Sequence, residues 1–190
     1  HQKRISNFLQ EKSIKTIIDV GAHKGEFAEN ALKIRSVEKI IAFEPQKKIF
    51  EILKNKFVDN KIITLNNYAL SGKVEKKIMK INKMSATSTL NQEINDDSLY
   101  FKFKSFLLHQ KNSIISEEEI NTTTFDIFFK YTTFDQSTLL KIDTEGYEIH
   151  VLNGSSKKIN EVKFILIENQ FSNMYKNVNF KDCHKFLEDK

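Results

Sequence analysis

Residues 139–148, with the sequence LLKIDTEGYE, decide the fold of this chain of 190 residues. A run of apolar residues ends abruptly in the acidic turn DTEG (143–146), and an amphipathic segment follows it. This pattern is typical of a buried strand that carries carboxylates to its C-terminal end, where open α/β sheets bind ligands. A second stretch, TIIDVGAHKGE (16–26), likewise joins a β-branched strand to a polar, glycine-containing loop.

Strands and helices alternate along most of the sequence. Strands joined in this way by right-handed crossovers form a parallel sheet with helices on both faces, so we predict an α/β fold with a mostly parallel sheet. The expected core strands are 16–20, 39–43, 62–65, 139–143 and 162–168, and the expected helices are 5–11, 26–34, 46–57, 125–130, 147–152 and 180–187.

The middle of the sequence departs from this alternation. Residues 73–81 alternate charged with apolar side chains, which predicts an exposed strand. Residues 82–121 are polar, glycine-free and partly aromatic, and we expect them to form a lid or acceptor-binding insertion. A separate short extended piece is expected to begin at 122–124. We expect a single domain over residues 1–190, with an N-terminal helix in residues 1–12.

Composition restricts the class of protein. Hydrophobic residues make up 39% and charged residues 29%, as in a globular chain, and the apolar runs are far too short for a membrane span. The single cysteine, Cys183, excludes an internal disulfide and fits a reducing compartment, so we expect a cytoplasmic protein. The net charge is +5, but the lysines are scattered without a basic stripe, which disfavours a nucleic-acid partner.

The loop DVGAHKG (19–25) allows a ligand to approach the backbone closely. It does not fit a dinucleotide fingerprint, because His23 and Glu26 stand where that motif has its second and third glycines. A phosphate-binding loop is disfavoured as well, since Gly25 is not followed by lysine. The acidic flanks, Asp19 and Glu26, suit a ligand with an amino group better than a pyrophosphate. The alternative is an ordinary tight turn between strand and helix.

Glu44 ends the second expected strand, and Pro45 follows it. An acid at this place can accept both hydroxyls of a ribose, while the alternative is an acid that the helix dipole favours at a helix N-terminus. Together with the glycine loop, we favour the ribose interpretation. A ribose-binding acid without a pyrophosphate loop points to S-adenosylmethionine (SAM), which joins adenosine to an amino acid and contains no phosphate.

In this order, the motifs resemble the FkbM-type SAM-dependent methyltransferases. The matching stretches are DVGAHKG (19–25), FEP (43–45), NYALS (67–71), TFD (124–126), LKIDTEGYE (140–148), VLNG (151–154) and IE (167–168). The resemblance extends from about Thr16 to Glu168 and is most specific in KIDTEGYE. It implies a Rossmann-like methyltransferase fold and methyl transfer from SAM to a hydroxyl oxygen of a sugar, glycan or other small metabolite.

The resemblance also implies where individual residues lie. Cofactor-binding positions would be Asp19, Gly21 and Gly25 at the methionine end of SAM, with Ala22, His23 and Glu26 in the same loop, Glu44 and Pro45 at the ribose, Asn67 and Ala69 near the adenine, and Asp143 at the methyl end. Such methyltransferases normally continue into two further strands that form an antiparallel edge. We expect those strands to be absent from this chain, whose sequence ends at Lys190.

An alcohol must lose its proton when it is methylated, so a general base is expected. Asp143 is the first candidate because its strand-end position aims it at the ligand crevice; a structural or SAM-contacting role is the alternative. Glu145 could share that role or bind a metal with Asp143, but no third ligand stands at a matching spacing, so we predict no metal site. His109, in the expected insertion, could reach the acceptor. Lys141 lies two positions before Asp143, on the same side of the strand.

Two other functions are compatible with the sequence. One is a catalytically silent module that binds SAM or a nucleoside and acts through a partner, and the other is an RNA methyltransferase that uses the positive charge. The sequence predicts neither the methyl acceptor nor the oligomeric state.

Overall fold

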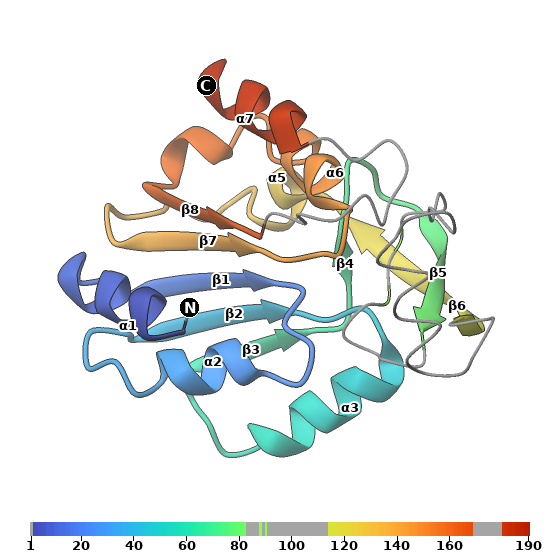
Figure 1. The fold of residues 1–190 in the computed structure, drawn as a ribbon, viewed down its shortest axis with the longest axis horizontal. Coiled ribbons are helices and arrows are strands. Elements are labelled where there is room, and N and C mark those ends of the chain that lie inside the picture. The colour runs from blue at the N-terminus through green and yellow to red at the C-terminus, as the bar shows by residue number, and fades with distance from the viewer. Residues whose placement is uncertain (1, 83–87, 89, 91–113, 169–179) are drawn as a thin grey trace, which may run out of the picture.

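The computed structural model describes residues 2–82, 88, 90, 114–168 and 180–190. Its main sheet has five parallel strands in the order β3–β2–β1–β7–β8 (Figure 1). The strands are β1 (Thr16–Val20), β2 (Lys39–Phe43), β3 (Ile63–Asn66), β7 (Thr138–Ile142) and β8 (Phe164–Ile167). The predicted α/β fold with a mostly parallel sheet is confirmed, and the predicted core strands are found with ends shifted by at most two residues.

Both faces of this sheet are covered, which explains why its strands are apolar throughout rather than alternating. Ile17 packs in one hydrophobic cluster with residues of α1 and α2, whereas its neighbour Ile18 packs in another with residues of α5, α6 and α7. The helices are α1 (Gln2–Glu11), α2 (Glu26–Ala31), α3 (Lys47–Lys56), α5 (Phe125–Phe128), α6 (Glu148–Asn153) and α7 (Phe180–Glu188), with a 3-10 turn η2 at Ile159–Glu161. In the described ranges, none of these helices has the length and apolar content needed to cross a membrane.

A second sheet of three strands lies beyond the carboxyl ends of the main strands (Figure 1). Its strands are β4 (Ala69–Leu70), β5 (Lys76–Asn82) and β6 (Ile114–Thr123). β6 is central: it pairs parallel with β4 and antiparallel with β5. The predicted exposed strand at 73–81 corresponds to β5.

The position of β6 corrects the prediction for residues 82–121, because residues 114–121 belong to this strand and not to an insertion. The separate piece expected at 122–124 is the end of the same strand. The segment SEEE (116–119) lacks the apolar alternation that would have revealed a strand. Lysines on β5 compensate its charge instead: Lys76 Nζ lies 2.9 Å from Glu119 Oε1, and Lys80 is the register partner of Glu117. Residues 91–113 of the expected lid, with His109, lie outside the described residues.

The main strands end at one level, so the residues after them form a row along the sheet. Val20 is the register partner of both Phe43 and Ile142, and Ile142 is in turn the partner of Ile167. The residues that directly follow these four strand ends are Gly21, Glu44, Asp143 and Glu168. Polar groups from distant parts of the sequence are therefore gathered at one edge.

Gly21 brings the loop after β1 into contact with the end of β7. Its φ of +81° lies in the left-handed region that favours glycine. A Cβ atom at this position would lie 1.9 Å from the carbonyl oxygen of Asp143, so no side chain fits there. Glycine is thus required both by the conformation of the loop and by the close approach of two backbones.

We expect Gly21→Ala to lower the free energy of unfolding by at least about 2 kcal/mol, because it adds backbone strain and a clash with a main-chain carbonyl. Gly72→Ala is the matched control, since its Cβ would find its nearest heavy atom, His150 O, at 3.6 Å. That control should change stability by less than about 1 kcal/mol. Urea unfolding followed by circular dichroism measures both, and equal losses in the two variants would contradict the assignment.

Candidate active site

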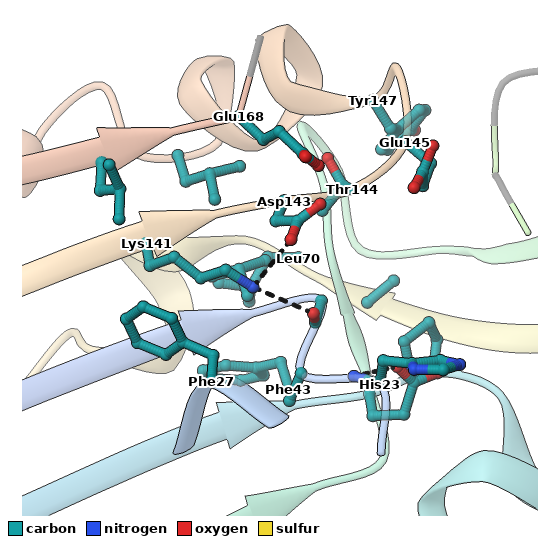
Figure 2. Close-up of a pocket in the computed structure, with 18 of the residues that line it drawn as sticks. His23, Phe27, Phe43, Leu70, Lys141, Asp143, Thr144, Glu145, Tyr147 and Glu168 are labelled. Atoms are coloured by element: carbon teal, nitrogen blue, oxygen red, sulfur yellow. Dashed lines mark hydrogen bonds and ion pairs between the residues drawn. The ribbon is translucent and has the colours of Figure 1, made fainter. Parts of the chain in front are cut away.

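A cavity of about 830 Å³ lies at the row of strand ends (Figure 2), and its size is that of a small-molecule or cofactor site. Nine of the residues predicted for the site line it: Gly21, Ala22, His23, Glu26, Glu44, Pro45, Ala69, Asp143 and Glu145. Asp19, Gly25 and Asn67 are not among the described lining residues, and His109 belongs to the part of the chain that is not described. Lining residues that the sequence interpretation did not assign to the site include Phe27, Gln46, Lys141, Tyr147 and Glu168.

Glu44 forms one polar corner of the cavity. Its side chain is buried, with 2% exposure of the residue, and each carboxylate oxygen accepts one backbone N–H. The donors are His23 N, 2.9 Å from Oε2, and Gln46 N, 2.8 Å from Oε1. The side chain of Gln46 hydrogen-bonds to the same carboxylate. Because a carboxylate oxygen can accept more than one hydrogen bond, the group keeps acceptor capacity for a ligand. Burial raises the pKa of Glu44 to about 7, although the two backbone N–H groups and the Gln46 side chain oppose this rise.

Asn67 acts on the backbone of this corner. Its Nδ2 donates to the carbonyl oxygens of Glu44, at 2.9 Å, and Pro45, at 3.0 Å. The amide therefore holds the exit of β2 in place. The position of Asn67 near the adenine, which the family resemblance implies, stays a prediction.

Lys141 stands at the centre of the row, with only 9% of its side chain exposed. Its Nζ lies 3.0 Å from Asp19 Oδ1. It also lies 3.1 Å from Asp143 Oδ2 (Figure 2), and it donates to the Gly21 carbonyl oxygen at 3.3 Å. Asp19 and Lys141 are register partners on β1 and β7, which puts both side chains on one face of the sheet. Burial lowers the pKa of Lys141, but the two carboxylates outweigh it and hold the pKa above its usual value.

The DTEG turn is organised by Glu148. Its Oε1 accepts hydrogen bonds from Thr144 N at 3.0 Å, Gly146 N at 3.1 Å and Thr144 Oγ1 at 3.1 Å. Glu145 and Gly146 have φ values of +54° and +87°, so two successive residues are left-handed. This conformation is strained for Glu145, a kind of strain that concentrates at functional sites. The second glutamate of the motif is thus a buried structural residue that shapes the turn.

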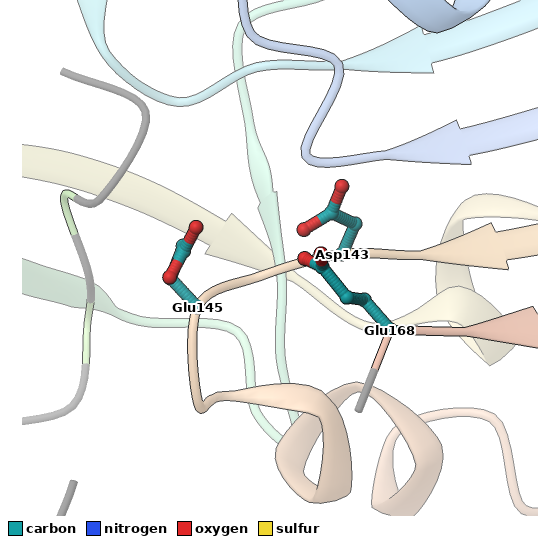
Figure 3. Close-up of side chains that lie close together, drawn as sticks. All are labelled: Asp143, Glu145 and Glu168. Atoms are coloured by element: carbon teal, nitrogen blue, oxygen red, sulfur yellow. The ribbon is translucent and has the colours of Figure 1, made fainter. Parts of the chain in front are cut away.

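Three carboxylates meet at the other end of the cavity. One oxygen each of Asp143, Glu145 and Glu168 lies within 4.8 Å of the others (Figure 3). Burial opposes ionisation of Asp143, but a hydrogen bond with Glu168 and the charge of Lys141 prevail and lower the pKa of Asp143. The same hydrogen bond, with burial and the neighbouring charges, raises the pKa of Glu168 to about 8. Asp143 is therefore the ionised partner, and Glu168 carries the proton near neutral pH.

The argument against a metal site assumed that no third ligand was available, and the position of Glu168 corrects it. This third carboxylate directly follows the neighbouring strand β8, so spacing within the turn at 143–146 does not reveal it. Oxygen ligands at this separation could hold a divalent cation. Acidic groups often gather without an ion, and we assign no metal here.

Tyr147 connects the turn to the second sheet. Its hydroxyl lies 3.0 Å from Ser71 Oγ and accepts from Lys77 Nζ at 2.9 Å, while its ring stacks on His150 with centroids 4.2 Å apart. The residue is buried, at 4% exposure, and lines the cavity. The second sheet thereby supports the wall of the site near Glu145.

A family model described as the methyltransferase FkbM domain matches residues 19–190. The chain belongs to this family. The resemblance seen in the motifs is thus confirmed.

One solved structure supports this fold. The FkbM-family chain is similar to methyltransferase FkbM from Methylobacillus flagellatus KT, with a TM-score of 0.57 and 17% identity over 93% of this chain and 37% of that one. The chain thus spans little more than a third of that protein's length. A candidate rRNA-methylase from Clostridium thermocellum aligns with a TM-score of 0.49 and 11% identity over 98% of this chain and 78% of that one. Among curated proteins, none matches significantly.

We expect stability to depend on pH through Glu44. In the folded chain its carboxyl keeps a proton up to about pH 7, whereas in the unfolded chain it loses the proton near its ordinary pKa of 4.5. Unfolding at a pH between these two pKa values releases a proton from Glu44. Raising the pH should therefore lower the free energy of unfolding, by up to about 3 kcal/mol. Glu44→Gln should remove this part of the dependence. Urea unfolding from pH 4.5 to 7.5 measures it, and identical pH profiles would contradict the assignment.

Proposed function

We propose that this FkbM-family protein is a SAM-dependent methyltransferase that methylates a hydroxyl oxygen of a sugar, glycan or other small metabolite. The observation that carries the proposal is the buried carboxylate of Glu44 on the cavity wall, which keeps acceptor capacity beside the hydrogen bonds that it already accepts. Such a group suits the two hydroxyls of a ribose. It stands beside a glycine loop that lacks the pattern for a pyrophosphate, which favours SAM over a dinucleotide.

The residues at the opposite end suit the reactive part of SAM. SAM carries a positively charged sulfonium and an amino group, and the wall there holds Asp143, Glu145 and Glu168. Of these, Asp143 is held in its ionised form beside Lys141. Opposite charges attract more strongly in a site shielded from water, so this wall favours a cationic ligand. When bound, SAM would supply an electrophilic methyl group on its sulfur.

Within this proposal, Asp143 receives the proton of the acceptor. The hydroxyl O–H bond breaks and its proton moves to a carboxylate oxygen of Asp143. An oxygen lone pair of the acceptor forms the new bond to the methyl carbon, and the electrons of the broken C–S bond stay on sulfur. The chain contributes mainly by holding acceptor and donor in line, which supplies much of the rate in such displacements. The cavity walls also limit access of water.

The alternatives differ in what they demand of this site. An RNA methyltransferase must bring a phosphate backbone to the acceptor end, where the ionised Asp143 and its acidic neighbours would repel it. A silent SAM-binding module needs the Glu44 corner but has no need for the carboxylates at the other end. The acidic wall therefore favours a small hydroxylated acceptor.

We expect isothermal titration calorimetry to show SAM binding by the parent protein. Glu44→Ala should weaken it by at least about tenfold, since a hydrogen bond to a charged group contributes about 1.5–3 kcal/mol. Glu51→Ala, at an exposed position of α3, is the control and should bind like the parent. A parent that does not bind SAM, or a Glu44→Ala variant with unchanged affinity, would refute the cofactor assignment.

We expect Asp143→Asn to lower kcat by at least about 100-fold while SAM still binds, because the variant cannot take the proton. Release of S-adenosylhomocysteine with a panel of sugars, glycans and hydroxylated metabolites measures this, and Asp59→Asn, at an exposed position, is the control. SAM binding without turnover on any acceptor would favour the silent module. Turnover on RNA alone, with affinity falling steeply with salt, would favour the RNA methyltransferase.

A further inference from the structure

We propose that Lys141 is a positioning residue of the methyl-transfer reaction, an inference that rests on the proposed function. Its ammonium joins Asp19, beneath the glycine loop, to Asp143, at the acceptor end, and so holds the two halves of the site in a fixed relation. Figure 2 shows its contact with Asp143. The family resemblance assigned no role to this lysine.

Lys141 acts through its neighbours, because protein groups surround its ammonium. It forms ion pairs with Asp19 Oδ1 at 3.0 Å and Asp143 Oδ2 at 3.1 Å, and it donates a hydrogen bond to the Gly21 carbonyl oxygen at 3.3 Å. The ring of Phe27 covers it further, with its centroid 5.3 Å from Nζ. These contacts hold the ammonium against the protein, so we assign Lys141 to organising the site rather than to binding the acceptor.

Asp19 depends on this contact. It has 0% exposure, and among the described residues its carboxylate has no hydrogen-bond partner that could replace the ion pair with Lys141. A buried carboxylate without a counter-charge is strongly destabilising or takes up a proton. Loss of the ammonium would therefore disturb the floor of the cavity as well as the acceptor end.

Asp143 depends on the same ammonium for its direction and charge. Lys141 contacts Oδ2, and the side chain is 31% exposed, so the carboxylate still reaches the cavity. The other charged or titratable groups that act on it are Asp19 from β1, His23 from the glycine loop, Glu145 from the turn and Glu168 after β8. Of these, Asp19 and Glu145 oppose its negative charge, whereas the hydrogen bond with Glu168 favours it and Lys141 is a buried cation in direct contact with it. Lys141 thus keeps Asp143 ready to accept a proton.

The test compares Lys141→Met, which removes the charge at similar length, with Lys141→Arg, which keeps it. We expect Lys141→Met to lower kcat at saturating SAM at least about tenfold. It should also move the acidic limb of the kcat–pH profile to higher pH by at least about one unit. The reason is that an adjacent opposite charge depresses a carboxyl pKa by about 1–3 units, and the variant removes that charge from Asp143. Lys141→Arg should keep that limb near the parent's position even if kcat falls. Lys54→Met, on the exposed surface of α3, should change neither.

A double variant, Asp19→Asn with Lys141→Met, separates positioning from folding. Removing both charges should restore much of the melting temperature lost in Lys141→Met, but kcat and the acidic limb should stay altered. If the double variant recovers the parent's kcat and pH profile together with its stability, Lys141 is only structural and the proposal is wrong.

Carbon-13 NMR titration of the Asp143 carboxyl in the parent and Lys141→Met gives a readout that needs neither SAM nor turnover. The proposal requires a higher titration midpoint in the variant, and an unchanged midpoint would overturn it. If the midpoint shifts but the parent does not bind SAM, the ion-pair network stands and the proposed function fails. The double variant supplies a folded protein for the same measurement if Lys141→Met alone does not fold.

Discussion

The structure depends above all on the parallel, in-register pairing of the main strands. Val20, Phe43, Ile142 and Ile167 lie at one level, so whatever follows them in the sequence meets at one edge of the sheet. Hydrogen bonding across the sheet fixes this level to within a residue, because a slip would turn every side chain to the opposite face. The strands themselves are mostly apolar, and the polar groups of the site lie at their exits or, as with Asp19 and Lys141, one residue before the strand end.

At those exits, burial makes each polar group depend on a partner. Glu44 is stabilised by backbone N–H groups, Glu148 by the turn that it caps, and Asp19 by the ammonium of Lys141. The surroundings of each carboxyl group thereby decide whether it is ionised: Asp143, beside the ammonium, has a lowered pKa, while Glu168 has a raised pKa. Carboxylates pushed apart in this way are typical of sites that move protons.

Much of this could be predicted because the signals are local. A β-branched run followed by a glycine or an acid marks both a buried strand and its functional exit, and Gly21, Glu44 and Asp143 were found in this way. Glu168 also follows a core strand, and the same rule would have found it. Features that depend on contacts between strands were missed. β6 was missed because its acidic run, SEEE, is compensated by lysines on another strand rather than by an apolar face of its own.

The sequence by itself determined the α/β class, the core strands, the family and nine of the residues that line the cavity, because strand patterning and turn chemistry are encoded within a few neighbouring residues. Only the tertiary structure decided which charged groups contact one another and which of them are ionised. It placed Asp19 under the wall rather than on it, joined it through Lys141 to Asp143, and brought Glu168 beside Asp143 from another strand. Charge states depend on burial and on partners in space, and these are set by strand order and register rather than by spacing along the chain.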